Sequence, residues 1–251
     1  MPKPSVRISM NTHHDISSEE HGRRFAEALI RAGLAPERVS TSDYFKDPFV
    51  SPEHFAKRWW AMRVEMRVDG VKDESYLGPS WQRRSAPAGR GYVTHGSINL
   101  RNNKIPSGVW FDSRWSAKTP FLNLFEEWVE FACPYMAILH LFTEPEQQKA
   151  KSEPERMFQL GGWGSLARRT VQNLGWATAF GDALAEEVDV EKIRRAGFPV
   201  KSLGGAWVVQ VTDNLSDVAL DFPNFSRRRA ELKSLFRAGM FEIEREPLYS
   251  V

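Results

Sequence analysis

Residues 119–143 read TPFLNLFEEWVEFACPYMAILHLFT, and this stretch carries the clearest structural signal in the chain. Its opening Thr-Pro pair is typical of a helix start. Apolar residues then recur on one helical face, at Leu122, Phe125, Val129 and Ala132. Pro134 ends this pattern because proline cannot continue a helix. The run 135–142 is apolar except at His140, which predicts a strand covered on both faces and a core histidine with one hydrogen-bond partner.

Two further helices are predicted on the amino-terminal side. Residues 16–33 (ISSEEHGRRFAEALIRAG) contain a capping box formed by Ser17 and Glu20 and end at Gly33. A second helix is expected to begin at Ser51, because proline follows it in the first-turn position.

Strand signals follow these helices. Apolar and charged residues alternate over 64–68, which predicts a strand. Residues 77–91 are rich in Gly, Pro, Ser and Arg and are expected to form a loop. Two strands are expected beyond it, at 92–100 and 109–112.

The carboxyl-terminal side mixes helices and strands. Residues 144–156 are highly polar with two prolines, so they are the best candidate for an internal boundary. A helix is expected over 182–196, ended by Gly197, and a strand over 206–212. A last helix is expected to begin at Ser226. Because there is no regular βαβ rhythm, the sequence predicts an α+β fold with a mainly antiparallel sheet and flanking helices, as one domain or two packed halves.

Composition narrows the class of protein. The 251 residues include 34 basic and 32 acidic side chains, and the resulting charge of +2 lacks the strongly basic footprint of a dedicated nucleic-acid binder. Cys133 is the only cysteine, which excludes an intramolecular disulfide and fits a reducing compartment. The first ten residues lack an apolar signal-peptide core, and no segment reaches the length of a membrane helix. We therefore expect a cytoplasmic protein without membrane partners.

Motifs that could carry chemistry are weak. His13, His14, Asp15 and His21 could all bind a metal, but they lack the spacing of known metal-binding motifs. His95 and Ser97 could suggest a hydrolase, yet the chain has no GxSxG nucleophile turn. We therefore predict no catalytic residues, no metal and no cofactor.

The sharpest enzymatic alternative is a metal-dependent nuclease using Asp221, Glu231 and Lys233. An acid followed by an E-x-K triplet resembles the metal site of restriction-type nucleases, where the triplet lies on a strand. Here the surrounding pattern is helical, and on a helix Glu231 and Lys233 point about 200° apart. The geometry therefore disfavours a shared metal ion.

Two charged stretches remain. Three consecutive arginines, Arg227 to Arg229, are interpreted as a helix start with one arginine held by a core-side acid such as Asp221, and contact with a partner is the open alternative. Five acids lie within ten residues, at Asp182, Glu186, Glu187, Asp189 and Glu191. Such a helix is usually a solvated face, but complementary charge also speeds and selects protein association. We predict that these five residues bind a protein partner.

Several motifs resemble the immunity proteins of bacterial polymorphic-toxin systems. They are AGFPV, GGAWVVQVTDNL, DFPNFSRRRAELKSLFRAGMFEIE and the central LHLFT, with RRFAEALIRAGLAPERVS and FVSPEHFAKRWW compatible with the same group. The motifs most resemble an α+β immunity family that is often paired with restriction-endonuclease-like toxins. Type VI or related secretion systems deliver those toxins. The resemblance implies a non-enzymatic protein that binds a cognate toxin, a nuclease above all, in the cytoplasm and blocks its active site or substrate access.

Overall fold

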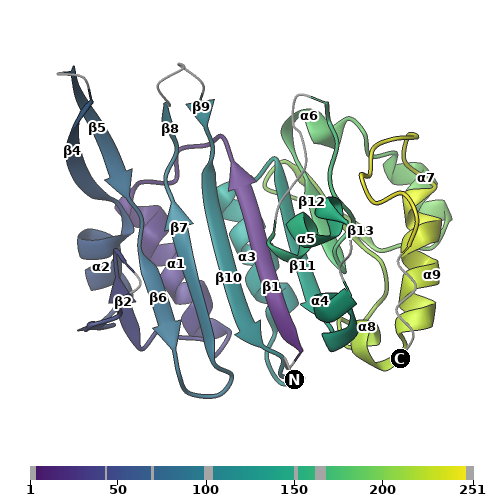
Figure 1. The fold of residues 1–251 in the computed structure, drawn as a ribbon, viewed down its shortest axis with the longest axis horizontal. Helices are drawn as coiled ribbons and strands as arrows, with labels where there is room; N and C mark the ends of the chain where they lie inside the picture. The colour runs from purple at the N-terminus through teal and green to yellow at the C-terminus, as the bar shows by residue number, and fades with distance from the viewer. Residues whose placement is uncertain are drawn as a thin grey trace. The chain divides into compact units, whose positions relative to one another are not determined.

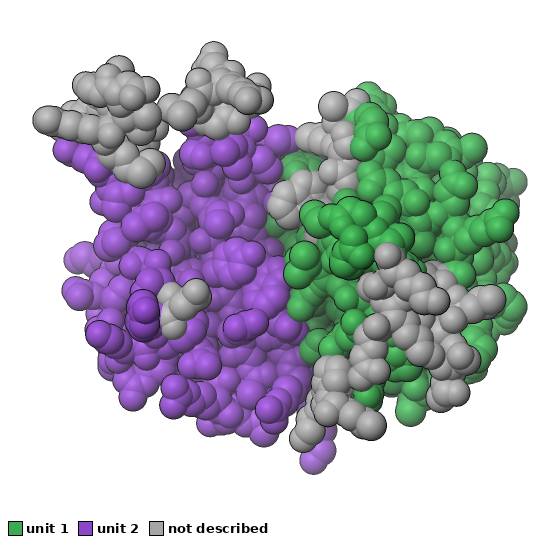
Figure 2. Space-filling view, viewed as in Figure 1, with its two compact units in different colours: residues 1–10, 133–251 green, residues 11–132 purple. Residues whose placement is uncertain are grey.

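The computed structural model describes residues 4–42, 44–68, 71–98, 104–149, 152–161 and 168–246, with the backbone alone at 66–68, 71–74 and 148–149. The chain divides into two units, shown in Figure 2. Unit 1 comprises residues 1–10 and 133–251, and unit 2 comprises residues 11–132. The predicted boundary region, 144–156, lies within unit 1, and its residues 150 and 151 are outside the described ranges. The single domain of residues 1–251 stays a prediction.

Unit 2 is built on an antiparallel sheet with the strand order β10-β7-β6-β2-β3. Its strands are β2 (Arg38–Ser40), β3 (Asp47–Pro48), β6 (Ser80–Arg83), β7 (Gly89–Thr94) and β10 (Ser107–Arg114). Two antiparallel hairpins accompany it: β4 (Met62–Val68) with β5 (Val71–Leu77), and β8 (Ser97–Ile98) with β9 (Lys104–Ile105). Strand β1 (Ser5–Thr12) begins in unit 1 and ends in unit 2.

Helices cover one face of the unit 2 sheet. They are α1 (Glu19–Arg31), α2 (Pro52–Phe55), the π-helix η1 (Ala56–Trp60) and α3 (Phe121–Ala132), and Figure 1 shows α1 and α3 behind the strands. Phe25 of α1 stacks on Trp128 of α3 with ring centroids 4.1 Å apart, and it meets the edge of Trp81 from β6 at 5.2 Å. This aromatic cluster fixes the helices against the strands.

Unit 1 contains a second set of strands in the order β13-β14-β12-β11-β1. They include β11 (Met136–Phe142), β12 (Ala177–Phe180), β13 (Val200–Leu203) and β14 (Ala206–Gln210). Its helices are α4 (Glu144–Lys149), α5 (Glu153–Gln159), α6 (Asp182–Ala185), α7 (Val190–Arg195), α8 (Asp217–Leu220) and α9 (Phe222–Lys233). All seven residues of β11 are buried, which confirms the predicted central strand.

The predicted α+β class with a mainly antiparallel sheet and flanking helices is confirmed. The helices predicted around 16–33 and after Thr119 are present, as is the strand over 64–68. The strand predicted over 206–212 is also present, but it ends at Gln210. Among the helices of the described ranges, none is both long and apolar enough to cross a membrane.

The prediction of a loop over 77–91 is wrong. This stretch contributes β6 and the first part of β7, and Trp81 is fully buried. The glycine richness reflects close packing rather than turns, because a Cβ atom at Gly91 would lie 2.3 Å from the Trp81 ring and 2.6 Å from the Trp110 carbonyl oxygen.

Two predicted helix starts are also wrong. The side chain that caps α1 is Ser18, which accepts a hydrogen bond from the His21 amide, and not Ser17. Helix α9 begins at Phe222 with Asp221 as its cap, because the Asp221 carboxylate accepts from the Asn224 amide and Pro223 fills the first turn. Ser226 therefore lies inside the helix.

Candidate functional site

The predicted acidic helix over 182–196 is two short helices. Helix α6 ends at Ala185, and α7 begins at Val190 after a turn. Asp189 starts the second helix, because its carboxylate accepts a hydrogen bond from the Lys192 amide at 3.0 Å. The five predicted partner-binding acids therefore do not share one helix face.

Three of these five carboxylates already have arginine partners within unit 1. Glu186 lies 2.8 Å from Arg169, and Glu191 lies 3.1 Å from Arg194. Glu187 is only 14% exposed and lies 2.8 Å from Arg237. The remaining two, Asp182 and Asp189, are exposed. The segment is thus a mixed-charge surface rather than a purely acidic one, and its role in binding stays a prediction.

The three consecutive arginines have three different environments. Arg227 is exposed and donates to the Asn224 side chain at 2.6 Å. The Arg228 guanidinium lies 3.9 Å from the centroid of the Phe198 ring and also pairs with Glu231. Arg229 is 1% exposed and forms part of the core. The run is therefore mainly structural, as interpreted, but the carboxylate that holds Arg229 is not Asp221.

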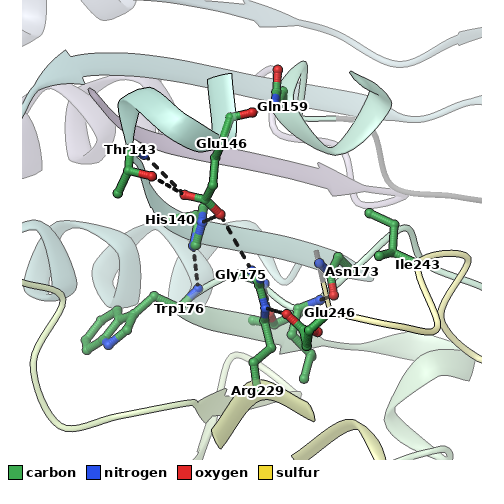
Figure 3. Close-up of polar contacts among 12 residues, drawn as sticks. His140, Thr143, Glu146, Gln159, Asn173, Gly175, Trp176, Arg229, Ile243 and Glu246 are labelled. Atoms are coloured by element: carbon green, nitrogen blue, oxygen red, sulfur yellow. Dashed lines mark hydrogen bonds and ion pairs between the residues drawn. The ribbon is translucent and has the colours of Figure 1, made fainter. Parts of the chain in front are cut away.

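Arg229 belongs to a buried ionic network, which Figure 3 shows. Its Nε donates to Glu246 Oε2 at 2.6 Å, and its Nη1 lies 3.9 Å from Glu146 Oε1. Lys233 follows one turn later on α9, and its Nζ lies 2.7 Å from Glu246 Oε1. Nζ also donates to Asn173 Oδ1 at 3.1 Å and to the Ile243 carbonyl oxygen.

His140 connects this network to the central strand. Its Nδ1 accepts a hydrogen bond from the Trp176 amide at 3.1 Å, so the hydrogen of a neutral ring lies on Nε2. Nε2 in turn lies 3.2 Å from Glu146 Oε1. The other Glu146 oxygen accepts from the amide and the hydroxyl of Thr143. The predicted core position of His140 is confirmed, but the ring has two partners instead of one.

Burial and pairing set the charges of the network. Burial lowers the pKa of His140, and the neighbouring Glu146 opposes that shift. Burial alone would raise the pKa of Glu146, but His140, Arg229 and Thr143 outweigh it and lower that pKa. Burial also lowers the pKa of Lys233, against the attraction of Glu246. The network thus combines two carboxylates, two cations and a neutral imidazole.

This arrangement suits a structural role. Both ring nitrogens of His140 are engaged, so the imidazole has no free lone pair with which to act as a base. The network instead joins β11, α4, α9 and the segment that contains Glu246. The sequence patterns do not indicate that Glu146 and Glu246 pair with Arg229, or that Arg229 and Lys233 are buried.

The structure does not bring the nuclease residues together. Asp221 caps the start of α9, Glu231 is exposed and paired with Arg228, and Lys233 points into the buried network. Within the described residues, no group of three His, Cys, Asp or Glu side chains could hold a metal ion.

The weak histidine motifs meet in unit 2. His13, His14, Asp15, His95 and Ser97 line a cavity of about 220 Å³, together with Tyr76 and Lys104. His95 Nε2 lies 2.5 Å from the Trp60 carbonyl oxygen, and burial lowers the pKa of His95. His21 is not among the residues that line this cavity, and its Nδ1 lies 2.7 Å from the Ser18 hydroxyl. Sequence spacing could not show this meeting, since about 80 residues separate the two motifs.

Comparisons with known proteins point to a shared fold. No protein-family model and no curated protein matches the chain. Among solved structures, the Pseudomonas aeruginosa T6SS protein PA0821 is similar, with 12% sequence identity and a TM-score of 0.52. The match covers 95% of this chain and 73% of that protein. At this identity, the likeness establishes a common fold.

Proposed function

We propose that this protein is an immunity protein of a type VI secretion-associated toxin system. It binds a cognate secreted toxin in the cytoplasm and blocks the toxin's active site or its access to substrate. We propose that this toxin is a nuclease. The protein acts by binding and not by catalysis, with neither nucleic acid nor membrane as its direct partner.

The observation that carries this proposal is the fold shared with a T6SS protein over 95% of the chain. It agrees with the resemblance of the sequence motifs to immunity proteins. The three residues of the nuclease alternative have other contacts in this structure. Asp221 caps a helix, Glu231 pairs with Arg228 at the surface, and Lys233 lies in the buried network. These contacts also favour binding over hydrolysis.

The acidic segment remains our proposed contact with the toxin. Asp182, Glu186, Asp189 and Glu191 are exposed, whereas Glu187 is held by Arg237 and supports the segment from within. Exposed charges of this kind act mainly on the rate of association, because complementary fields steer the two proteins together.

Co-expression tests the proposal. The toxin encoded by the neighbouring gene should arrest growth when expressed alone, and this chain should restore growth and co-purify with the toxin as a stable complex. A catalytically inactive toxin serves as the control for complex formation without toxicity. If the chain neither restores growth nor binds that toxin, the proposal is wrong.

A nuclease assay tests the non-enzymatic part separately. The purified chain with Mg²⁺ should leave single- and double-stranded DNA and RNA intact, and Glu231→Ala should behave as the unmodified protein does. Cleavage that requires Mg²⁺ and is lost in Glu231→Ala would instead identify the protein as a metal-dependent nuclease.

A further inference from the structure

The unit 2 sheet has an exposed face opposite α1 and α3 (Figure 1). Side chains alternate along β10, so Val109 and Phe111 are buried while Trp110 and Arg114 project from the other side. The strand register extends this second side across the sheet. We define the open face by the residues Arg38, Gln82, Arg90, Tyr92, Trp110, Asp112 and Arg114.

An aromatic pair lies on the open face. Tyr92 of β7 is directly opposite Trp110 of β10, and their rings stack with centroids 5.4 Å apart. The Tyr92 residue is 44% exposed. The Arg90 guanidinium lies 5.7 Å from the centroid of the Trp110 ring. Tyrosine, tryptophan and arginine are the residues enriched at protein interfaces.

The arginines of the open face have no carboxylate partner among the residues that the structure describes. Arg38, Arg90 and Arg114 are exposed, and within the part of the chain that the structure describes none of them forms an ion pair. Arg38 instead donates to the Lys46 carbonyl oxygen. By contrast, Arg31 pairs with Glu127 across unit 2. Three arginines therefore share the open face with one acid, Asp112, and the described residues of unit 2 form no ion pair with those arginines.

Arg84 adds to this charge at the edge of the open face. It is exposed, and its Nε lies 3.5 Å from the Gln82 side-chain oxygen. The acids nearby are fewer: Asp112 lies in the same cross-strand row as Arg90, and Glu37 accepts hydrogen bonds from the amides of Arg84 and Ser85. The Ser85 side chain, together with these two amides, lowers the pKa of Glu37 to about 2.

We propose that the open face docks an acidic surface of a protein partner. Aspartate and glutamate side chains of the partner would pair with Arg38, Arg90 and Arg114, while Tyr92 and Trp110 supply the apolar centre of the contact. The identification of that partner as the toxin rests on the proposed function. The open face would then be a second contact, separate from the acidic segment in unit 1.

Protein fits this face better than single-stranded nucleic acid. Bases bind by stacking on an available aromatic face. Here the Trp110 ring already contacts Tyr92 and the Arg90 guanidinium. Carboxylate side chains need only the arginine donors, which remain accessible.

Binding to the catalytically inactive toxin of the neighbouring gene tests the inference by biolayer interferometry. Arg90→Glu and Tyr92→Ala should each weaken binding about tenfold or more, as at other interface centres. Arg58→Glu is the matched control, because Arg58 is also exposed in unit 2 and lies 5.2 Å from the centroid of a tryptophan ring, that of Trp59. It should change the affinity by less than about twofold.

If the unmodified chain binds the toxin and both open-face variants retain its affinity, the inference is wrong while the proposed function stands. If the chain does not bind that toxin, the proposed function fails, and labelled poly-L-glutamate then decides the inference. The inference is supported if the chain binds poly-L-glutamate in a salt-sensitive way, and if Arg90→Glu weakens this binding while Arg58→Glu does not. Absence of that binding, or stronger binding of a single-stranded oligonucleotide lost in Trp110→Ala, would overturn it.

Discussion

At the scale of single residues, the arginine Arg229 lies in the core, although arginine side chains are mostly exposed in proteins. Arg229 follows two arginines in sequence, and only its place on the helix distinguishes it from them. Phe225, Arg229 and Leu232 share the buried side of α9, with Lys233 next to them. The helical period could have placed Arg229 beside Phe225 in the sequence. It could not have supplied Glu246 and Glu146, which come from distant segments.

Replacing Arg229 should strongly destabilise unit 1. Arg229→Met leaves the buried Glu146 and the half-buried Glu246 with less compensating charge, and breaking a buried ion pair typically costs about 3–5 kcal/mol of unfolding free energy. Urea denaturation measures this loss. Arg227→Ala is the control, because Arg227 is exposed and should change stability by about 0.5 kcal/mol or less. Equal effects of the two variants would contradict the assigned network.

His140 should make stability depend on pH. Because burial lowers its pKa below the ordinary value of 6.5, the unfolded chain binds a proton more readily than the folded chain. The stability that this group contributes is complete above pH 6.5 and is lost as the pH falls toward the lower folded-state value. His95 is shifted in the same direction, so the measurement compares the unmodified chain with His140→Gln between pH 5 and 7. Parallel curves would exclude a contribution from His140.

At the scale of elements, capping chemistry decides where helices begin. Several polar residues in this chain precede apolar helical patterns, and the sequence does not rank them. The sequence offers Asp221 as a metal ligand or as an arginine partner, yet its carboxylate caps α9. Ser226 has the right residue type but lies one turn too late, after Pro223 has already fixed the first turn.

Two matched variants test the start of α9. Asp221→Ala removes the side chain that accepts from the Asn224 amide and should lower the unfolding free energy by about 1 kcal/mol. Ser226→Ala, inside the helix, should be nearly neutral or slightly stabilising, because alanine has the higher helix propensity. Thermal unfolding followed by circular dichroism compares them. If Ser226→Ala lowered the unfolding free energy more than Asp221→Ala, Ser226 would be the cap, as the sequence predicts.

Strand β6 is the element that sequence patterns hid most completely. It is four residues long and flanked by glycine and proline, so alternation is too brief to detect. Trp81 nevertheless lies within the aromatic cluster of unit 2, near Phe25 and stacked on Phe111. Trp81 is fully buried because residues distant in the sequence pack against it. The composition of residues 77–91 alone does not show this packing.

Trp81→Ala should therefore destabilise unit 2 severely. Removing a fully buried tryptophan typically costs about 3–5 kcal/mol, because the cavity that remains is only partly filled. Leu77→Ala, at a position 42% exposed, should cost far less. Chemical denaturation followed by fluorescence of the remaining tryptophans measures both. A small effect at Trp81 would restore the loop predicted for this segment.

At the scale of the whole molecule, the class of fold was within reach of the sequence and the candidate sites were not. Long periodic segments such as α3 and β11 identify themselves through their own apolar pattern. The ionic network and the histidine cavity each join residues separated by tens of residues, and one sequence contains no record of such contacts. The acidic segment shows the same limit, because Arg169 and Arg237 approach it from elsewhere in unit 1.

The acidic segment can still be tested as a contact with the toxin. Reversing Glu186 and Glu191 together to lysine should slow association by several-fold at low salt, with little change in dissociation, because both side chains are about 70% exposed. Glu153→Lys is the control, since Glu153 is 68% exposed and pairs with an arginine three residues later, as Glu191 does. An unchanged association rate at low salt would remove this segment from the proposed contact.

The division of the chain into units has a consequence for the order of folding during synthesis. Unit 1 takes its first residues from before unit 2 and the rest from after it. All of residues 11–132 leave the ribosome before β11, so unit 2 can fold before any of the other strands of unit 1 has been made. Unit 1 closes only after Glu246 emerges to neutralise Arg229 and Lys233. Nascent chains should therefore gain protease resistance in two steps, with residues 11–132 protected first.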